Sequence, residues 1–161
     1  MRAFIIGAVA GLALSGVVTL ASSAHAAPPK PVQLGAFEVI APSSAMKDLN
    51  AFLGEYCASN KLDKETVKRI SDGALPVMTE LLAGEAEEIM PIIESSFESS
   101  EAVAERYEDL CTKDAQAEIA KEQKKISESH PKAKVMYAKN KKLIDGAVVE
   151  AVAKIREILA G

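Results

Sequence analysis

Apolar residues recur at intervals of three and four along most of the chain after residue 43, and runs of β-branched residues are absent. Steps of three and four return to one side of an α-helix, so this spacing predicts amphipathic helices. The segments that show it are about 44–58, a section from Asp63 to near Gly84, a section around "EAEEIMPIIESSF", about 100–127 and about 132–159. The pattern predicts an all-α fold, a four- or five-helix bundle, in one domain spanning residues 44–161.

Two prolines fall within these helical patterns, in "LPVMTELL" at 75–82 and "MPIIESSF" at 90–97. Proline lacks a backbone donor and clashes with the preceding turn, so Pro76 and Pro91 are expected to kink or divide helices. The two stretches suggest either a duplicated helix–kink unit or two independent helix starts or kinks. Upstream, Asp63 is a good N-cap, and Leu62 and Val67 are spaced to form a hydrophobic staple around it.

The N-terminal 26 residues have the pattern of a secretory signal peptide. Arg2 precedes an apolar run at 3–20, and "AHA" at 24–26 matches a small-x-small cleavage site, which predicts cleavage after Ala26. An uncleaved anchor is the alternative, because the run approaches the length that spans a bilayer. The glycines in the run and the cleavage site favour cleavage. The bacterial periplasm, or secretion, is therefore the expected location.

A proline-rich segment separates the signal peptide from the helical pattern. Residues 27–43 contain four prolines, which predicts an extended leader without helix. The chain that remains after cleavage is the size of one ordinary domain and can bury a core.

The chain contains only two cysteines, Cys57 and Cys111, and both fall on predicted apolar faces. An oxidising compartment favours a disulfide between them, while intermolecular bridging and free thiols are the alternatives. In the loop-entropy description, this bridge stabilises the fold by about 4 kcal/mol.

Motifs for catalysis, metal binding or cofactor attachment are missing from the sequence. There is no Cys-x-x-Cys pair, and after cleavage His130 is the only histidine, which is too few for an ordinary zinc site. Glu-x-x-His, His-Glu-x-x-His, Gly-x-Ser-x-Gly and phosphate-binding glycine loops are also missing. We therefore expect no catalytic residues, no metal and no cofactor, and an enzyme is the least favoured class.

Charge is segregated along the chain, which carries a net charge of −4. Residues 80–109 are strongly acidic with Arg106 as their one base, whereas residues 121–142 are rich in lysine. The two segments would attract each other if they lie side by side in the bundle. Alternatively, the lysine-rich segment 121–142 binds an anionic membrane or envelope polymer. The candidate residues are Lys132, Lys134, Lys139, Lys141 and Lys142. Tyr137 is the only aromatic residue there, so nucleic-acid binding is not expected.

The stretch "CTKDAQAEI" after Cys111 resembles the polar stretch that follows the second cysteine of HdeA-type periplasmic acid-stress chaperones. That resemblance implies a small exported helical protein with one disulfide, which binds unfolded clients in acid. The acid-rich segment would lose its charge at low pH and supply a trigger. The chain departs from the family because it lacks a Trp before Cys57 and continues for fifty residues beyond Cys111.

The main expectation is an exported, non-enzymatic helical-bundle protein that serves as an envelope binding module for a protein partner. The alternatives are an acid-responsive chaperone and a binder of anionic surfaces.

Overall fold

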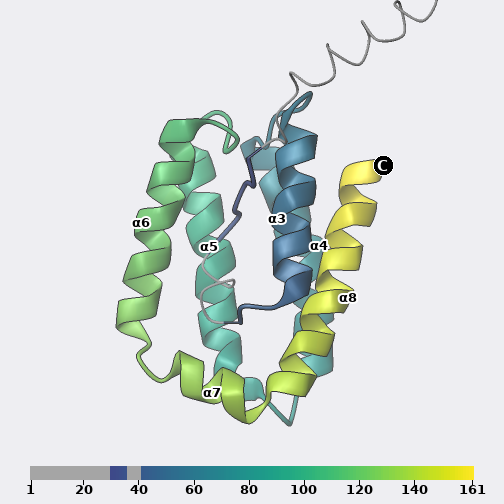
Figure 1. Ribbon diagram of the computed structural model, residues 1–161, viewed down its shortest axis with the longest axis vertical. Helices are drawn as coiled ribbons and strands as arrows, with labels where there is room; N and C mark the ends of the chain where they lie inside the picture. The colour runs from purple at the N-terminus through teal and green to yellow at the C-terminus, as the bar shows by residue number, and fades with distance from the viewer. Residues whose placement is uncertain (1–29, 36–40) are drawn as a thin grey trace, which may run out of the picture.

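The computed structural model describes residues 30–35 and 41–161, and all regular structure within them is helical (Figure 1). The α-helices are α3 (Ser44–Cys57), α4 (Lys64–Leu82), α5 (Met90–Arg106), α6 (Lys113–Ser129), α7 (Ala133–Lys139) and α8 (Lys141–Ala160), with a short 3-10 helix η1 (Glu87–Ile89) before α5. The all-α class is confirmed, but these six α-helices exceed the four or five predicted. The predicted signal peptide, 1–26, lies outside the described residues, as do 27–29 and 36–40 of the leader.

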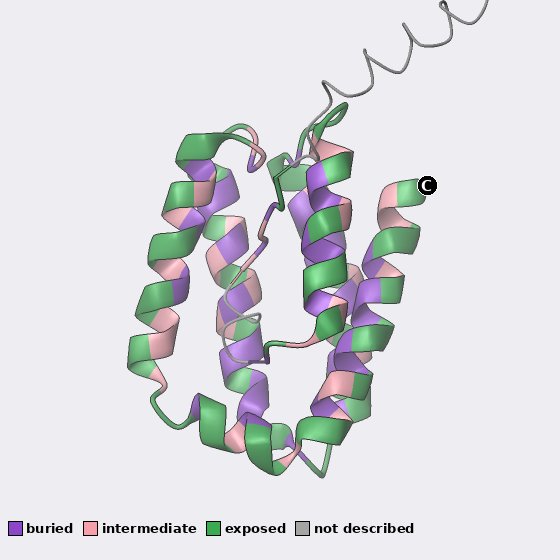
Figure 2. Cartoon of the chain, viewed as in Figure 1, coloured by how far each residue is buried: buried purple, intermediate pink, exposed green. Residues whose placement is uncertain are grey.

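The helices pack side by side with their apolar faces turned inward. Helix α4 has its most extensive contacts with α8 and also packs on α5, while α6 packs on α5 and α3 on α8. Figure 2 shows the buried residues along the facing sides of the helices and the exposed residues outside. Leu49, Leu53, Ile70, Met78 and Ile93 are among the large side chains that are almost fully buried in this core.

Residues 30–35 run between α3 and the pair α5 and α6, where they fill the space left by the helices (Figure 1). Val32 and Leu34 are buried, and the Val32 amide donates to the Asn50 carbonyl oxygen at 3.0 Å. Gly54 allows this close approach, because a Cβ atom there would collide with the Lys30 carbonyl oxygen. The segment therefore belongs to the core of the described structure.

Side-chain caps fix the starts of several helices. The Asp63 carboxylate accepts from the Thr66 amide at 2.9 Å, which confirms the predicted N-cap of α4. Ser43 caps α3 and Thr112 caps α6 in the same way. Capping satisfies amides that have no partner within the helix, so these residues determine where each helix begins.

Two predicted helices are each divided in the structure. The prediction of one continuous helix at 100–127 is wrong. Helix α5 ends at Arg106, Tyr107 has an extended backbone, and Thr112 caps a new helix. The helix expected at 132–159 is wrong as well. Its break is at Asn140, whose backbone leaves the helical region between α7 and α8. Apolar residues point inward on both sides of each break. The spacing of apolar residues in the sequence therefore continues across the break as it would in one helix.

The two prolines have different roles. Pro76 lies inside α4, whereas Pro91 lies in the first turn of α5, where a missing amide has no cost. On the apolar stripe of α4, Leu82 is buried, whereas its neighbour Leu81 is 41% exposed. Leu82 continues the stripe because it lies one four-residue step beyond Met78.

Candidate functional site

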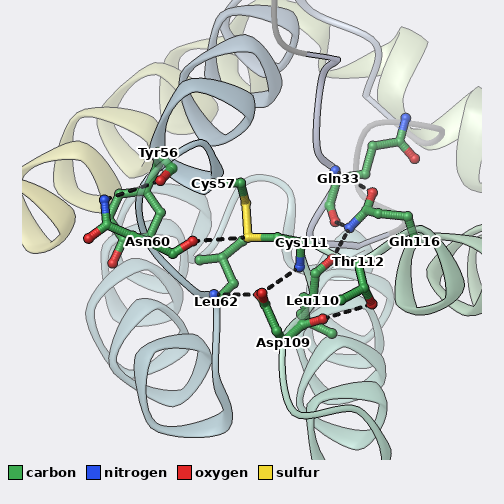
Figure 3. Close-up of a disulfide and its surroundings, with 10 residues drawn as sticks. All are labelled: Gln33, Tyr56, Cys57, Asn60, Leu62, Asp109, Leu110, Cys111, Thr112 and Gln116. Carbon is green, nitrogen blue, oxygen red and sulfur yellow. Dashed lines mark hydrogen bonds between the residues drawn. A yellow bond between two sulfur atoms is a disulfide. The ribbon is translucent and has the colours of Figure 1, made fainter.

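Cys57 and Cys111 form a disulfide, with their Cα atoms 5.7 Å apart (Figure 3). The bridge joins the end of α3 to the connection between α5 and α6. Cys111 therefore lies in a turn and not inside the helix that was predicted at 100–127. Neither sulfur is available as a thiol nucleophile, because both belong to the disulfide.

Asp109 organises the backbone around the disulfide (Figure 3). Its Oδ1 accepts from the Leu62 and Cys111 amides, each at 2.9 Å, while the Leu110 amide donates to the Leu62 carbonyl oxygen at 2.9 Å. Cys111 Sγ lies 3.6 Å from the Asn60 carbonyl oxygen, which is a contact and no hydrogen bond, because a disulfide sulfur carries no proton. These bonds hold the two segments together independently of the disulfide.

The side chains of α5 and α6 bind the backbone of residues 30–35. The Gln116 amide group donates to the Gln33 carbonyl oxygen at 3.0 Å and accepts from the Gln33 amide at 2.9 Å (Figure 3). Gln123 Nε2 donates to the Gly35 carbonyl oxygen at 2.6 Å, and the Ser100 hydroxyl donates to the Leu34 carbonyl oxygen. All of these hydrogen bonds involve backbone groups of residues 30–35, so they depend on the extended backbone of this segment and little on the identity of its side chains.

An open groove of about 720 Å³ lies between α4 and α5. Its lining includes five carboxylates and no basic side chain: Asp72 and Glu80 from α4, and Glu94, Glu98 and Glu101 from α5. Half-buried Leu75 and Phe97, together with Pro76, contribute apolar surface to the same groove. Two acidic rows therefore flank an apolar strip.

Two further groups distinguish this groove from an ordinary acidic surface. Ser71 lines it and is only 5% exposed, yet its hydroxyl has no hydrogen-bond partner within the described residues. Lys68 pairs with Asp72 at 3.2 Å from the same helix, whereas the four glutamates have no ion-pair partner in the described structure. The groove thus has an excess of negative charge and one unused buried hydroxyl.

The candidate lysines divide into two groups, although all of them are exposed. Lys141 pairs with Asp145 at 2.8 Å, and the Tyr137 hydroxyl donates to the same carboxylate at 2.5 Å. Hydrogen bonding to Asp145 raises the pKa of Lys141, while burial and the bond to Asp145 raise the pKa of Tyr137. Burial disfavours ionisation of Asp145, but the two hydrogen bonds outweigh it and its pKa is lowered. Lys141 is therefore engaged within the fold.

The other candidates lie on or next to α7 and at the start of α8, without ion pairs in the described structure: Lys132, Lys134, Lys139 and Lys142. Val135 lies among the first three and is 67% exposed. Lys139 also lines a hollow of about 200 Å³ with Glu85, Glu87 and Glu88. No ion pair joins residues 80–109 to the lysines of 121–142, all of which the structure describes.

A cavity of about 40 Å³ is lined mainly by apolar side chains, including Leu34, Met46 and Met78, and is too small for more than a very small molecule. Within residues 30–35 and 41–161, no cluster of His, Cys, Asp and Glu could hold a metal ion. Across the same residues, every helix is too short or too polar to cross a membrane.

Comparison with known proteins finds no matching family model, and no curated protein or solved structure matches the chain.

Sequence reasoning did not identify Asp109, Gln116, Gln123 or Ser71. In the sequence, polar side chains in charged segments look like ordinary surface residues. Only the tertiary structure shows that Asp109, Gln116 and Gln123 form hydrogen bonds with backbone groups and that Ser71 lines the groove. Of the four, only Asp109 had a signal in the sequence. It lies three residues before the capping Thr112, and a cysteine lies between the two residues.

Proposed function

We propose that the protein is an exported helical-bundle binding module without catalytic activity, and that it binds a basic segment of a protein partner. The observation that carries this proposal is the groove between α4 and α5, in which five carboxylates surround an apolar strip. The signal-like N-terminus and the Cys57–Cys111 disulfide support the exported location, because disulfides persist in oxidising compartments.

The chemistry of the groove favours a cationic side chain with a long apolar stem. Asp72 and Glu80 are eight residues apart on α4, which separates them by about 12 Å along the helix axis. Lysine and arginine stems would lie on Leu75 and Phe97 while their charged ends reach the carboxylates. Clefts lined by charge of one sign also attract oppositely charged partners over a distance. A segment of several basic residues fits this arrangement better than a single small cation.

Fluorescence anisotropy with a labelled peptide of alternating lysine and alanine tests the proposal. The double variant Glu94→Gln/Glu98→Gln removes two groove charges, and Glu87→Gln/Glu88→Gln removes the same charge outside the groove. Two exposed charge contacts contribute roughly 0.4–2 kcal/mol, so the groove variant should bind about two- to thirty-fold more weakly. The matched control should bind like the wild type. Equal losses in both variants would show that the peptide responds only to net charge, and the proposal would fail.

Binding of an anionic membrane or envelope polymer is a second candidate, supported by exposed Val135 among unpaired lysines at α7. An apolar side chain surrounded by lysines is suited to an anionic interface. Co-sedimentation with anionic liposomes should be reduced by the triple variant in which Lys132, Lys134 and Lys139 become Gln. The same change at 121, 124 and 125 on α6 is the matched control. Equal binding by both variants would reject this surface.

The acid-stress chaperone remains a third proposal, and the contacts made by residues 30–35 support its client-binding part. Release of this segment would uncover the apolar surface that now buries Val32 and Leu34, together with side-chain amides that bind extended backbone. Gln116, Gln123 and Ser100 do not titrate, so acid would have to act elsewhere in the fold. Light scattering with an aggregating client at about pH 2–3 is the test. Aggregation that proceeds unchanged in its presence would exclude this function.

A further inference from the structure

The outer face of α8 is apolar in part and has no partner within the described structure. Val149 on this helix is 53% exposed, and Leu81 on neighbouring α4 is 41% exposed. A hollow of about 520 Å³ lies at the junction of the two helices, with Leu143, Gly146 and Ala147 in its lining. A Cβ atom at Gly146 would have no neighbouring atom within 4 Å, so the helix backbone is open there.

The residues of this face are arranged symmetrically about Gly146. Lys142 and Glu150 lie four residues to either side of it, and both line the hollow. Leu143 and Val149 lie three residues to either side. Positions three and four apart share a helix face, so these side chains belong to one surface. The surface therefore carries opposite charges at its ends, apolar residues inside them and a glycine at its centre.

We propose that α8 packs antiparallel against α8 of a second copy of this chain, with the two-fold axis at Gly146. In that arrangement Lys142 faces Glu150 of the second copy, and Glu150 faces its Lys142. Leu143 and Val149 meet in the same reciprocal way, and Leu81 extends the apolar contact onto α4. A two-fold interface requires such self-complementarity, because each residue pair occurs twice.

Three observations favour a second copy over another occupant. The charges are complementary to the same surface after a two-fold rotation, and neither Lys142 nor Glu150 has an ion-pair partner in the described structure. Glycine at the crossing point allows the helix axes to approach to about 8 Å, the lower end of ordinary helix packing. The surface shares no residue with the groove between α4 and α5, so the dimer and the proposed binding function are independent.

Sedimentation equilibrium of the exported, processed chain tests the dimer through a charge exchange. Lys142→Glu and Glu150→Lys each place like charges together twice, and each should raise the dimer dissociation constant at least ten-fold. The double variant Lys142→Glu/Glu150→Lys restores opposite charges and should return the constant to within about three-fold of the wild type. A double variant as weak as the single variants would overturn the proposal.

Gly146→Gln provides a test that does not depend on charge. The side chain fits the isolated chain, because the position is open, but it would occupy the dimer axis. We expect a monomer whose melting temperature, measured at low concentration, is no lower than that of the wild type, since most residues favour a helix interior more than glycine does. A wild-type chain that remains monomeric at about 1 mM, or a Gly146→Gln variant that still dimerises, would overturn the proposal.

Discussion

Replacing Cys57 and Cys111 together by alanine should lower the free energy of unfolding by about 4 kcal/mol. The two residues are separated by 54 positions, so the disulfide closes a long loop in the unfolded chain. With that loop length, the loop-entropy relation gives an entropy difference of about 14 cal/mol/K, which corresponds to about 4 kcal/mol at 25 °C. This is a large share of the stability of an ordinary domain.

The native state should lose little when the bridge is removed. Both cysteines are only partly buried, so the missing sulfur atoms leave no large cavity. Asp109 continues to hold the Leu62 and Cys111 backbone amides, and Leu110 continues to donate to Leu62. The variant should therefore fold to the same structure, and its loss of stability should arise mainly in the unfolded chain.

Urea denaturation followed by far-UV circular dichroism measures the effect. For an m-value near 2 kcal/mol/M, the midpoint should fall by about 2 M. Reductant should shift the wild type to the position of the double variant and leave the double variant unchanged, which provides the control. A loss below about 1 kcal/mol would refute the reasoning, because the unfolded chain would then gain little freedom when the loop is opened.

Three further predictions concern the helix connections and the core. Asp109→Ala should cost about 1–3 kcal/mol in urea denaturation, because two backbone amides lose their acceptor; an unchanged midpoint would contradict this. The pKa of Asp63 is lowered by hydrogen bonds from Thr66, and that of Asp145 is lowered as described above. The stabilisation from these two carboxylates is fully present above the unfolded pKa of 3.8 and is lost as the pH falls through the lower folded pKa values. The urea midpoint should therefore decrease when the pH drops below about 4, and it should decrease less in the Asp145→Asn variant. Leu53→Ala, at a fully buried position, should cost about 2–5 kcal/mol in the same assay, and a loss under 1 kcal/mol would contradict the packing described.

Helical periodicity was sufficient to predict the fold class and most helix positions, but not the connections between helices. Val103, Leu110 and Ala115 are all buried, although the chain leaves the helix between the first two. A turn that packs on the core continues the apolar spacing, so periodicity alone cannot detect it. The local signal was Thr112 followed by acidic Asp114, which is typical of a helix start.

The break at Asn140 had an even weaker signal. Lysines surround it on both sides, and lysine is compatible with a helix interior. What divides α7 from α8 is the need to turn the chain at the end of the bundle, where α7 contacts η1 before α8 returns along α4. That requirement comes from tertiary packing and has no counterpart in the spacing of apolar residues.

The distribution of acidic residues shows why charge along the sequence is a poor guide to a binding surface. Of the acid-rich segment 80–109, four glutamates line the groove, whereas Asp109 accepts backbone hydrogen bonds near the disulfide. The four are Glu80, Glu94, Glu98 and Glu101. Asp72 lies outside that segment and still joins the groove, because α4 packs against α5. Carboxylates gathered from two helices repel one another, and within the described residues only Lys68 offsets that repulsion directly. A basic partner would remove this repulsion at the same time as it forms new contacts. The carboxylates of the groove therefore support the proposed cationic partner more directly than the modest net charge of the whole chain does.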